Sequence, residues 1–306
     1  MNEKIKLKIQ QYIKESGKSQ TAVSKEFGVS TAMLSTYLNG TYAGNSETLE
    51  GKAEEFFALR EKSAAITKAP DYVETSISKQ VYDTISYCHI NRCIGTIVGD
   101  AGIGKTKGAK KYNEDYSEVI FITASKACKS LKDMYRMIAR KLRISENRNL
   151  FDMQMDIRSK LDGSNKVIVI DEAQHLSLTS IDGIRYFNDE DESGLEPVGI
   201  VLIGNHELRT KMMGKYEHTL AQLFNRVQMQ RLIFTSNVLD EDIKKLFPVY
   251  VQNNMEKEIK FLHSIAQSRW GIRGAVKVFV NSSNNEDITI KGLETMAKFM
   301  GIGIAI

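Results

Sequence analysis

One stretch of eight residues constrains the fold of this 306-residue chain more than any other. Residues 99–106 read Gly-Asp-Ala-Gly-Ile-Gly-Lys-Thr, which fills every fixed position of the phosphate-binding pattern G-x-x-x-x-G-K-[ST]. The apolar run Ile94–Val98 before this stretch is typical of a buried parallel strand, and residues 106–112 after it can form a helix. The pattern requires this order of strand, loop and helix, so we predict a phosphate-binding loop.

The positions of this loop have distinct physical roles. Its glycines let backbone N–H groups approach phosphate oxygens, and the start of the following helix adds a partial positive charge. Lys105 would reach the β- and γ-phosphates of a nucleoside triphosphate, and the Thr106 hydroxyl would ligate Mg²⁺. The alternative is a glycine-rich turn before a helix. The predicted ATP contacts in the loop are Gly99, Gly102, Ile103, Gly104, Lys105, Thr106 and Lys107.

The charge balance is only mildly basic, because 42 Lys and Arg face 38 Asp and Glu for a net charge of +4. A surface for nucleic acid must therefore be local. No apolar run approaches the roughly 18 residues that a membrane span needs, and the first residues lack the apolar segment of a secretion signal. We expect a cytoplasmic protein that has no membrane partner.

The cysteines also indicate an intracellular protein. Cys88, Cys93 and Cys128 form no C-x-x-C pair, and an odd number without a secretion signal is typical of reduced thiols. Cys88, His89 and Cys93 could suggest a metal site, but a fourth ligand is missing nearby in the sequence. Buried thiols are the preferred interpretation.

Apolar runs alternate with helical stretches after the phosphate-binding loop, which indicates a parallel sheet covered on both faces. From about residue 238 the pattern is helical throughout, as in a small lid domain. The predicted strands are Ile94–Val98, Val119–Thr123, Val167–Ile170 and Val198–Ile203. The predicted helices are 76–90 and 131–142 in the core, and 239–251, 254–268, 274–281 and 288–300 in the lid.

Residues 63–70 are poor in large apolar side chains and end in Pro70, which is typical of a linker. We therefore predict four segments: a helix-turn-helix domain at 1–62, a linker at 63–75, an ATPase core at 76–237 and a helical lid at 238–306.

The segment 19–40 closely resembles the helix-turn-helix of the phage repressor and Cro family. The small Ser24 lets two helices approach, Gly28 would take the left-handed conformation of the turn, and Ser30 would cap the second helix. Leu34 and Leu38 then lie one turn apart on the buried face of that helix.

The second helix of this motif, residues 30–38, contains no Arg, Lys, Asn or Gln. These are the side chains that pair bidentately with base edges, so strong reading of a DNA sequence is not expected. Weak or shape-based DNA contact, a protein-docking module and a purely structural cap are the three interpretations left open.

Two acids follow the buried run Val167–Ile170. Parallel strands present such residues at their carboxyl edge, where ligands bind in α/β folds. Asp171 and Glu172 resemble the Walker B motif, in which Asp171 would hold Mg²⁺ and Glu172 would accept a proton from the attacking water. A strand followed by two acids is common by itself, but its place after a phosphate-binding loop favours the catalytic interpretation.

Asn205 and Arg273 resemble two sensor positions of the AAA+ ATPases. Asn205 follows an apolar strand and would help to orient the attacking water; the alternative is an Asn in an ordinary turn. Arg273 lies in a lid segment that resembles sensor 2 and would contact the nucleotide bound in the same subunit. A solvated arginine is the alternative for this residue.

Arg226, near the end of a helix predicted at 220–226, resembles the arginine finger of AAA+ proteins. Such an arginine reaches the γ-phosphate of a neighbouring subunit and can contribute about 10³ to 10⁵ in rate. Arg209 and Arg231 are rival candidates, and a solvated arginine at a helix end is the plain alternative. A finger supplied in trans implies a homo-oligomer that closes into a ring or continues as a helical filament.

The order of these segments resembles the MuB-like AAA+ transposition proteins, a group that includes TnsC-like and IstB-like proteins. The resemblance extends over essentially the whole chain. Its particular matches are Ala69–Pro70, Tyr72–Thr75, Ile170–Ala173, His175–Leu176, Leu202–His206 and Leu223–Phe224 with Arg226. It implies an AAA+ P-loop NTPase with a parallel sheet core and a small helical lid, preceded by an all-α helix-turn-helix domain.

The same resemblance implies a function. Members of the group form ATP-dependent helical oligomers on duplex DNA, recruit and activate a DDE transposase (MuA-like), and contribute to target selection and immunity. Their Mg²⁺-dependent ATP hydrolysis is stimulated by DNA and transposase. The resemblance therefore implies a protein of a bacterial cell that a phage or mobile element encodes.

The resemblance also implies that basic residues near the start of the helix after the second strand, and on a neighbouring hairpin or helix, contact the DNA backbone. The candidates are Lys126, Lys129, Arg158 and Lys160, each of which could instead be an ordinary solvated cation. Phosphate contacts carry no sequence information, which suits a protein that coats arbitrary target DNA.

Two rival functions share the ATPase core. A helicase loader or replication initiator would prefer single strands or origin sequences, yet the sequence shows no clear aromatic platform for unpaired bases. A transcription regulator would read an operator through its helix-turn-helix and use the ATPase core as a sensor, and the uncharged second helix counts against it.

Overall fold

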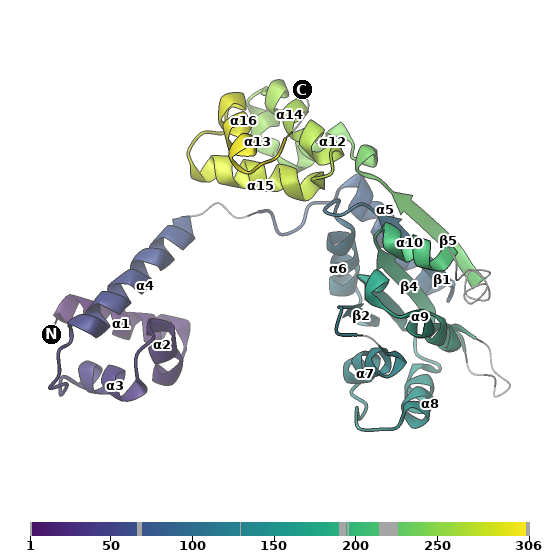
Figure 1. Ribbon diagram of the computed structural model, residues 1–306, viewed down its shortest axis with the longest axis horizontal. Coiled ribbons are helices and arrows are strands. Elements are labelled where there is room, and N and C mark those ends of the chain that lie inside the picture. The colour runs from purple at the N-terminus through teal and green to yellow at the C-terminus, as the bar shows by residue number, and fades with distance from the viewer. Residues whose placement is uncertain are drawn as a thin grey trace. The chain divides into compact units, whose positions relative to one another are not determined.

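The structure is a computed structural model that describes residues 2–65, 69–128, 130–189, 194, 196–213 and 226–303. Its contacts divide the chain into two compact units, Met1–Lys68 and Ala69–Ile306, which we describe separately (Figure 1). The finer predicted boundaries, including the linker at 63–75 and the start of the lid at 238, stay predictions.

The described part of the first unit contains four helices. They are α1 (Glu3–Ser16), α2 (Gln20–Phe27), α3 (Thr31–Asn39) and α4 (Glu47–Ala65). The last helix continues past residue 62, where we predicted the domain to end. Apolar side chains of all four helices form one core, in which Ile9, Val23, Leu34 and Leu49 are fully buried.

The turn between α2 and α3 has the local structure that the sequence predicts. Gly28 has a φ of 64°, in the left-handed region, and the Ser30 hydroxyl accepts a hydrogen bond from the Met33 N–H at 3.2 Å. The buried Ser24 hydroxyl lies 3.0 Å from the Thr31 hydroxyl and joins the two helices. Leu34 is buried on α3 together with Leu38, as predicted.

The second unit is built on a parallel sheet, which has five strands within the described residues. The strand order is β2-β3-β4-β1-β5, so β1 lies between β4 and β5 (Figure 1). The strands are β1 (Ile94–Gly99), β2 (Val119–Thr123), β3 (Val167–Asp171), β4 (Gly199–Gly204) and β5 (Val227–Ile233). The four predicted strands are confirmed, and β5 is a strand that our sequence analysis missed.

Helices cover both faces of this sheet, as the alternation of strands and helices predicts. On one face, α5 (Ser76–Ile90) and α6 (Lys105–Asp115) pack with the lid against alternate residues of β1, β3 and β4. On the other face the covering helices are α7 (Leu131–Leu142), α8 (Leu150–Leu161), α9 (Leu178–Ile184) and α10 (His206–Met213). Because β1, β3 and β4 are buried along their whole length, they read as continuous apolar runs.

The lid consists of helices, as predicted. They are α12 (Asp240–Leu246), α13 (Pro248–Gln252), α14 (Glu256–Gln267), α15 (Gly271–Asn284) and α16 (Ile290–Phe299). The single helix that we predicted at 239–251 is divided, because Pro248 cannot donate a backbone hydrogen bond and instead begins α13.

A buried carboxylate connects the lid to the core. Asp242, on α12, is 2% exposed and accepts hydrogen bonds from the Ser76 N–H at 2.5 Å and the Ser76 hydroxyl at 2.6 Å. It also accepts a bond from the Leu239 N–H at 3.0 Å. The start of α5 and the start of α12 are therefore held together.

The cysteine environment agrees with the buried-thiol interpretation. Cys88, Cys93 and Cys128 are free and buried, and burial raises the pKa of each thiol. The His89 ring is engaged at both nitrogens, which lie 2.8 Å from the Tyr112 hydroxyl and 2.8 Å from the Asn165 carbonyl. Among the described residues, no group of His, Cys, Asp or Glu is arranged to hold a metal ion by itself.

None of the helices in the described ranges has the length and apolar character needed to cross a membrane.

Candidate functional site

The predicted catalytic segments meet at the carboxyl edge of the sheet. The loop 99–106 follows β1, Asp171 ends β3, and Asn205 follows β4. Since β4 pairs with both β1 and β3 in parallel, all three strand ends lie at the same edge. The sheet thus collects residues that are as much as about a hundred positions apart in the chain.

The phosphate-binding loop leads directly into the first turn of α6. Gly102 and Gly104 have φ angles of 77° and 106°, which residues other than glycine rarely adopt. Gly104 is the N-cap residue of α6 and supplies no side-chain hydrogen bond to the first turn. The N–H groups of this turn and the positive end of the helix dipole are the features that bind phosphate.

Lys105 folds back over the loop. Its Nζ donates hydrogen bonds to the Gly99 carbonyl at 2.8 Å and to the Asp100 carbonyl at 2.6 Å. Burial lowers the pKa of Lys105 below its usual value, although the carboxylates of Asp171 and Glu172 act in the opposite direction. The Lys105 ammonium is therefore hydrogen-bonded to the loop in a buried place, where its charge is poorly solvated.

Thr106 and Asp171 form the pair that fits a magnesium ion. The Thr106 hydroxyl donates to Asp171 Oδ2 at 2.8 Å. Asp171 is 2% exposed, and burial raises its pKa above the usual value, partly offset by the hydrogen bond from Thr106. Hydroxyl and carboxylate oxygens are the hard ligands that Mg²⁺ prefers beside phosphate groups, and a cation here would compensate the buried carboxylate.

Glu172 follows Asp171 in an unusual backbone conformation. Its φ is 57°, in the left-handed region, and its N–H donates to Asp171 Oδ1 at 3.0 Å. Its side-chain Oε2 accepts a hydrogen bond from Gln174. Non-glycine residues with this φ are strained by roughly 1–3 kcal/mol and cluster at functional sites.

Asn205 lies at the end of β4 and begins the turn into α10. Its side-chain Oδ1 accepts a hydrogen bond from the Glu207 N–H at 2.9 Å, so it has the turn-forming role that we named as the alternative. Its backbone N–H donates to Gln174 Oε1 at 3.3 Å. The residue is therefore connected to the Walker B segment whichever role its side chain takes.

The lid contacts the phosphate-binding loop at Arg273. The Arg273 N–H donates to the Gly102 carbonyl at 2.9 Å, while the guanidinium side chain is exposed. The loop is also linked to the ends of two strands, because Asp100 accepts from the Thr235 N–H at 2.7 Å and pairs with His206 Nε2 at 2.9 Å. Our sequence analysis did not anticipate this second set of contacts.

Arg226 lies at the opposite edge of the sheet. It precedes β5, whose first residue pairs with Ile94 at the start of β1, so it is separated from its own phosphate-binding loop by the length of a strand. Its guanidinium forms an ion pair with Asp189. The rest of the helix predicted at 220–226 lies outside the described residues. Arg209 and Arg231, the rival candidates, are both exposed.

One of the predicted DNA contacts is wrong. Arg158 is 1% exposed, and its guanidinium donates to the Phe187 carbonyl at 2.7 Å and the Asp189 carbonyl at 2.6 Å. It supports the loop after α9 and cannot reach DNA without leaving the core. Lys126 and Lys160 are exposed. Lys129 lies outside the described residues.

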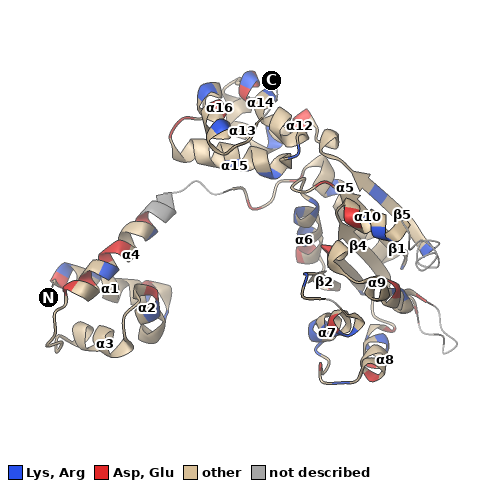
Figure 2. Ribbon diagram, viewed as in Figure 1, with Lys and Arg blue, Asp and Glu red and all other residues tan. Residues whose placement is uncertain are grey.

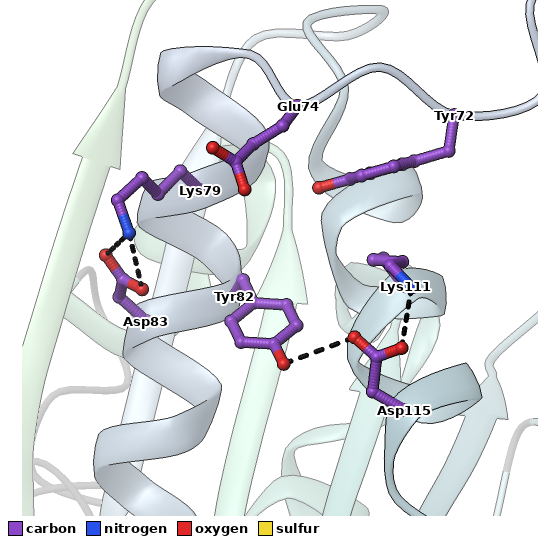
Figure 3. Close-up of a pocket in the computed structure, with 7 residues that line it drawn as sticks. All are labelled: Tyr72, Glu74, Lys79, Tyr82, Asp83, Lys111 and Asp115. Atoms are coloured by element: carbon purple, nitrogen blue, oxygen red, sulfur yellow. Dashed lines mark hydrogen bonds and ion pairs between the residues drawn. The ribbon is translucent and has the colours of Figure 1, made fainter.

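A cavity of about 230 Å³ lies on the outer side of α5 and α6, apart from this site (Figure 3). Most of its charges are already paired: Lys79 with Asp83, and Lys111 with Asp115, which also accepts from the Tyr82 hydroxyl. None of its lining residues is a predicted nucleotide contact.

The chain matches a known domain family over residues 90–212, described as an AAA domain. Two curated relatives are similar over most of its length. It is 29% identical to the "Mu-like prophage FluMu DNA transposition protein B" of Haemophilus influenzae, over 87% of this chain and 92% of the relative. It is 26% identical to the "ATP-dependent target DNA activator B" of Escherichia phage Mu, over 82% of this chain and 78% of the relative.

Two solved structures have a similar fold. Cdc6p from Pyrobaculum aerophilum aligns with a TM-score of 0.57 and 17% identity, over 79% of this chain and 72% of that one. The ORC2 protein of Aeropyrum pernix aligns with a TM-score of 0.53 and 12% identity, over 74% and 69%. Together with the parallel sheet and the domain match, these similarities confirm the AAA+ P-loop fold.

Proposed function

We propose that this chain, a MuB-like AAA+ protein, is an Mg²⁺-dependent ATPase that acts as a target-DNA activator in transposition. The observation that carries the ATPase proposal is the contact between the Thr106 hydroxyl and the buried Asp171 carboxylate beside the phosphate-binding loop. The names of the relatives support the role in transposition, because they describe a DNA transposition protein and an ATP-dependent target DNA activator.

In this mechanism each functional residue at the carboxyl edge of the sheet has a distinct role. The N–H groups of the loop and Lys105 bind the phosphates, and Thr106 with Asp171 would hold Mg²⁺. The metal supplies positive charge that stabilises the charge spread over the transferring phosphoryl group. Glu172 accepts the proton of the attacking water at a carboxylate oxygen.

The lid would report which nucleotide is bound. Because the Arg273 backbone already contacts Gly102, its side chain can turn toward the phosphates from within the subunit. Arg226 lies too far along the sheet to serve its own loop, which supports a role toward a neighbouring subunit. The active form in this proposal is a homo-oligomer, a ring or helical filament in which ATP joins successive copies.

Exposed cations near α7 and α8 are our proposed DNA-backbone contacts. Lys126 precedes α7, and Lys160 is on α8. Lys141, in the last turn of α7, and Arg143, the C-cap residue of that helix, are two more exposed cations that our sequence analysis did not consider. Figure 2 shows Lys and Arg on both α7 and α8. By contrast, Arg140 is engaged with Glu146 through two hydrogen bonds. Contacts of this kind bind any duplex, as an activator of arbitrary targets requires.

The partners in this proposal are double-stranded DNA and a DDE transposase (MuA-like), with the DNA-bound, ATP-loaded oligomer recruiting and activating the transposase. The uncharged outer face of α3 supports only weak or shape-based DNA contact by the first unit.

The test is equilibrium binding of the full-length protein to a fluorescent random-sequence duplex, with a slowly hydrolysed ATP analogue and at several salt concentrations. Lys126→Ala and Lys160→Ala should each reduce the slope of log K against log salt by about 1, because each removes one phosphate contact. Lys79→Ala, an exposed change on α5, is the matched control and should leave the slope unchanged. Tighter binding to single strands than to duplex would contradict the proposal and favour a helicase loader.

A further inference from the structure

A buried glutamine connects two residues of the proposed catalytic edge. Gln174 lies in the short helix η1 (Ala173–His175), two residues after Glu172, and is 4% exposed. Its Nε2 donates to Glu172 Oε2, and its Oε1 accepts from the Asn205 N–H at 3.3 Å. Both ends of one side-chain amide are therefore used, one on the Walker B segment and one on the end of β4.

The surroundings fix this amide in place. The Lys211 ammonium, on α10, donates to the backbone carbonyl of Gln174 and to that of Leu176 at 3.1 Å. Gly204 leaves the space that the amide occupies, because a Cβ there would lie 2.8 Å from Gln174 Oε1. The amide cannot be reversed without placing an N–H against the Asn205 N–H and a carbonyl against a carboxylate.

Glu172 depends on such a tether because of its backbone. With a φ of 57°, its side chain leaves the chain in a direction that ordinary strand geometry does not define. Among the described residues, its Oε2 is bonded to Gln174, whereas no partner is seen for Oε1. One carboxylate oxygen is thus positioned by the protein while the other can accept a hydrogen bond from water.

We propose that Gln174 is a positioning residue that holds the Glu172 carboxylate at a fixed place relative to the end of β4. This inference rests on the proposed ATPase function, in which Glu172 is the base. Gln174 does not touch the reacting atoms; it sets the direction of the group that does. Displacement of a catalytic group by about 1 Å can cost about 100-fold in rate, so loss of the tether lowers kcat.

Two variants separate this role from simple packing. Gln174→Met keeps the length of the side chain and removes both hydrogen bonds, and Gln174→Glu keeps an acceptor for Asn205 but places a carboxylate against Glu172. We expect both to lower kcat by about 10- to 100-fold while the KM for ATP and the Kd of an ATP analogue change by less than about threefold. Gln80→Met, on the exposed side of α5, is the matched control and should retain the kcat of the unchanged protein.

A double-mutant cycle with Glu172→Gln gives the decisive result. If Gln174 acts through Glu172, Gln174→Met should have no further effect on the residual hydrolysis of the Glu172→Gln protein. Multiplicative losses in the double mutant, or unchanged kcat in both Gln174 variants, would overturn the inference alone. Equal hydrolysis by the unchanged protein and Glu172→Gln would instead remove Glu172 as the base, and both the proposed mechanism and this inference would fail.

A thermal melt of each variant shows whether the protein is folded. If Gln174→Met does not fold, the nearly isosteric Gln174→Glu decides the question.

Discussion

Lys105 and Asp171 show at the scale of single residues why the carboxyl edge of the sheet suits a metal-bound nucleotide. Burial lowers the pKa of Lys105 and raises the pKa of Asp171, so each charge is held at a cost to the folded protein. Phosphate oxygens would compensate the first and Mg²⁺ the second. Binding of a magnesium nucleotide would thus offset the desolvation of both charges.

Arg226→Ala tests the proposed finger. We expect the variant to bind ATP like the unchanged protein, because Arg226 lies far from its own phosphate-binding loop, and to hydrolyse it about 10³-fold more slowly. The measurements are the Kd of an ATP analogue and the steady-state rate with duplex DNA. Arg209→Ala and Arg231→Ala are the matched comparisons. Loss of hydrolysis in one of these two, with a normal rate for Arg226→Ala, would assign the finger elsewhere.

Motif spacing predicted which residues meet at the carboxyl edge of the sheet, but it could not predict burial or the contacts between distant residues. The positions of Lys105, Thr106 and Asp171 follow from patterns whose residue types the chemistry dictates. Arg158 was predicted as a DNA contact, whereas it is buried beneath the loop after α9. Gln174 belongs to no pattern that we used, because its role depends on Asn205 lying beside it in the folded sheet.

At the scale of elements, the strands with continuous apolar runs were predicted, including the edge strand β2, whereas the other edge strand, β5, was not. β5 is largely exposed and alternates polar and apolar residues at its start, from Val227 to Gln230. This alternation with a period of two is a usable signal for a strand, but it covers only the first four residues of β5. In the lid, the division at Pro248 followed from the proline and was equally readable from the sequence.

The junction of α5 and α12 gives a prediction about stability. Asp242→Ala should lower the free energy of unfolding by about 3 kcal/mol, because it removes the acceptor of three hydrogen bonds in a buried place. Asp240→Ala, on the same helix, removes a partly exposed ion pair with Lys244 and should cost less than about 1 kcal/mol. Urea unfolding of the full-length variants measures both. Equal shifts in the two midpoints would show that the Asp242 contacts do not hold the lid to the core.

The whole molecule consists of two units with separate cores. The first unit buries its own apolar cluster, and the clusters of the second unit lie on the two faces of the sheet. We therefore expect the fragment 69–306 to melt cooperatively and to hydrolyse ATP without residues 1–68. Because residues 31–38 of α3 include no Arg, Lys, Asn or Gln, duplex affinity should fall by less than about tenfold, or 1.4 kcal/mol. Complete loss of duplex binding by the fragment would place the main DNA surface in the first unit.

The central claim is that ATP controls assembly of this protein on duplex DNA of any sequence. The most direct test is electron-microscope imaging of the full-length protein with random-sequence duplex in ATP, in ADP and without nucleotide, together with Glu172→Gln in ATP. We predict regular oligomers on the DNA with ATP only, and oligomers that persist longer with Glu172→Gln because its hydrolysis is slow. Discrete particles at one site, or the same appearance with ADP as with ATP, would contradict the claim.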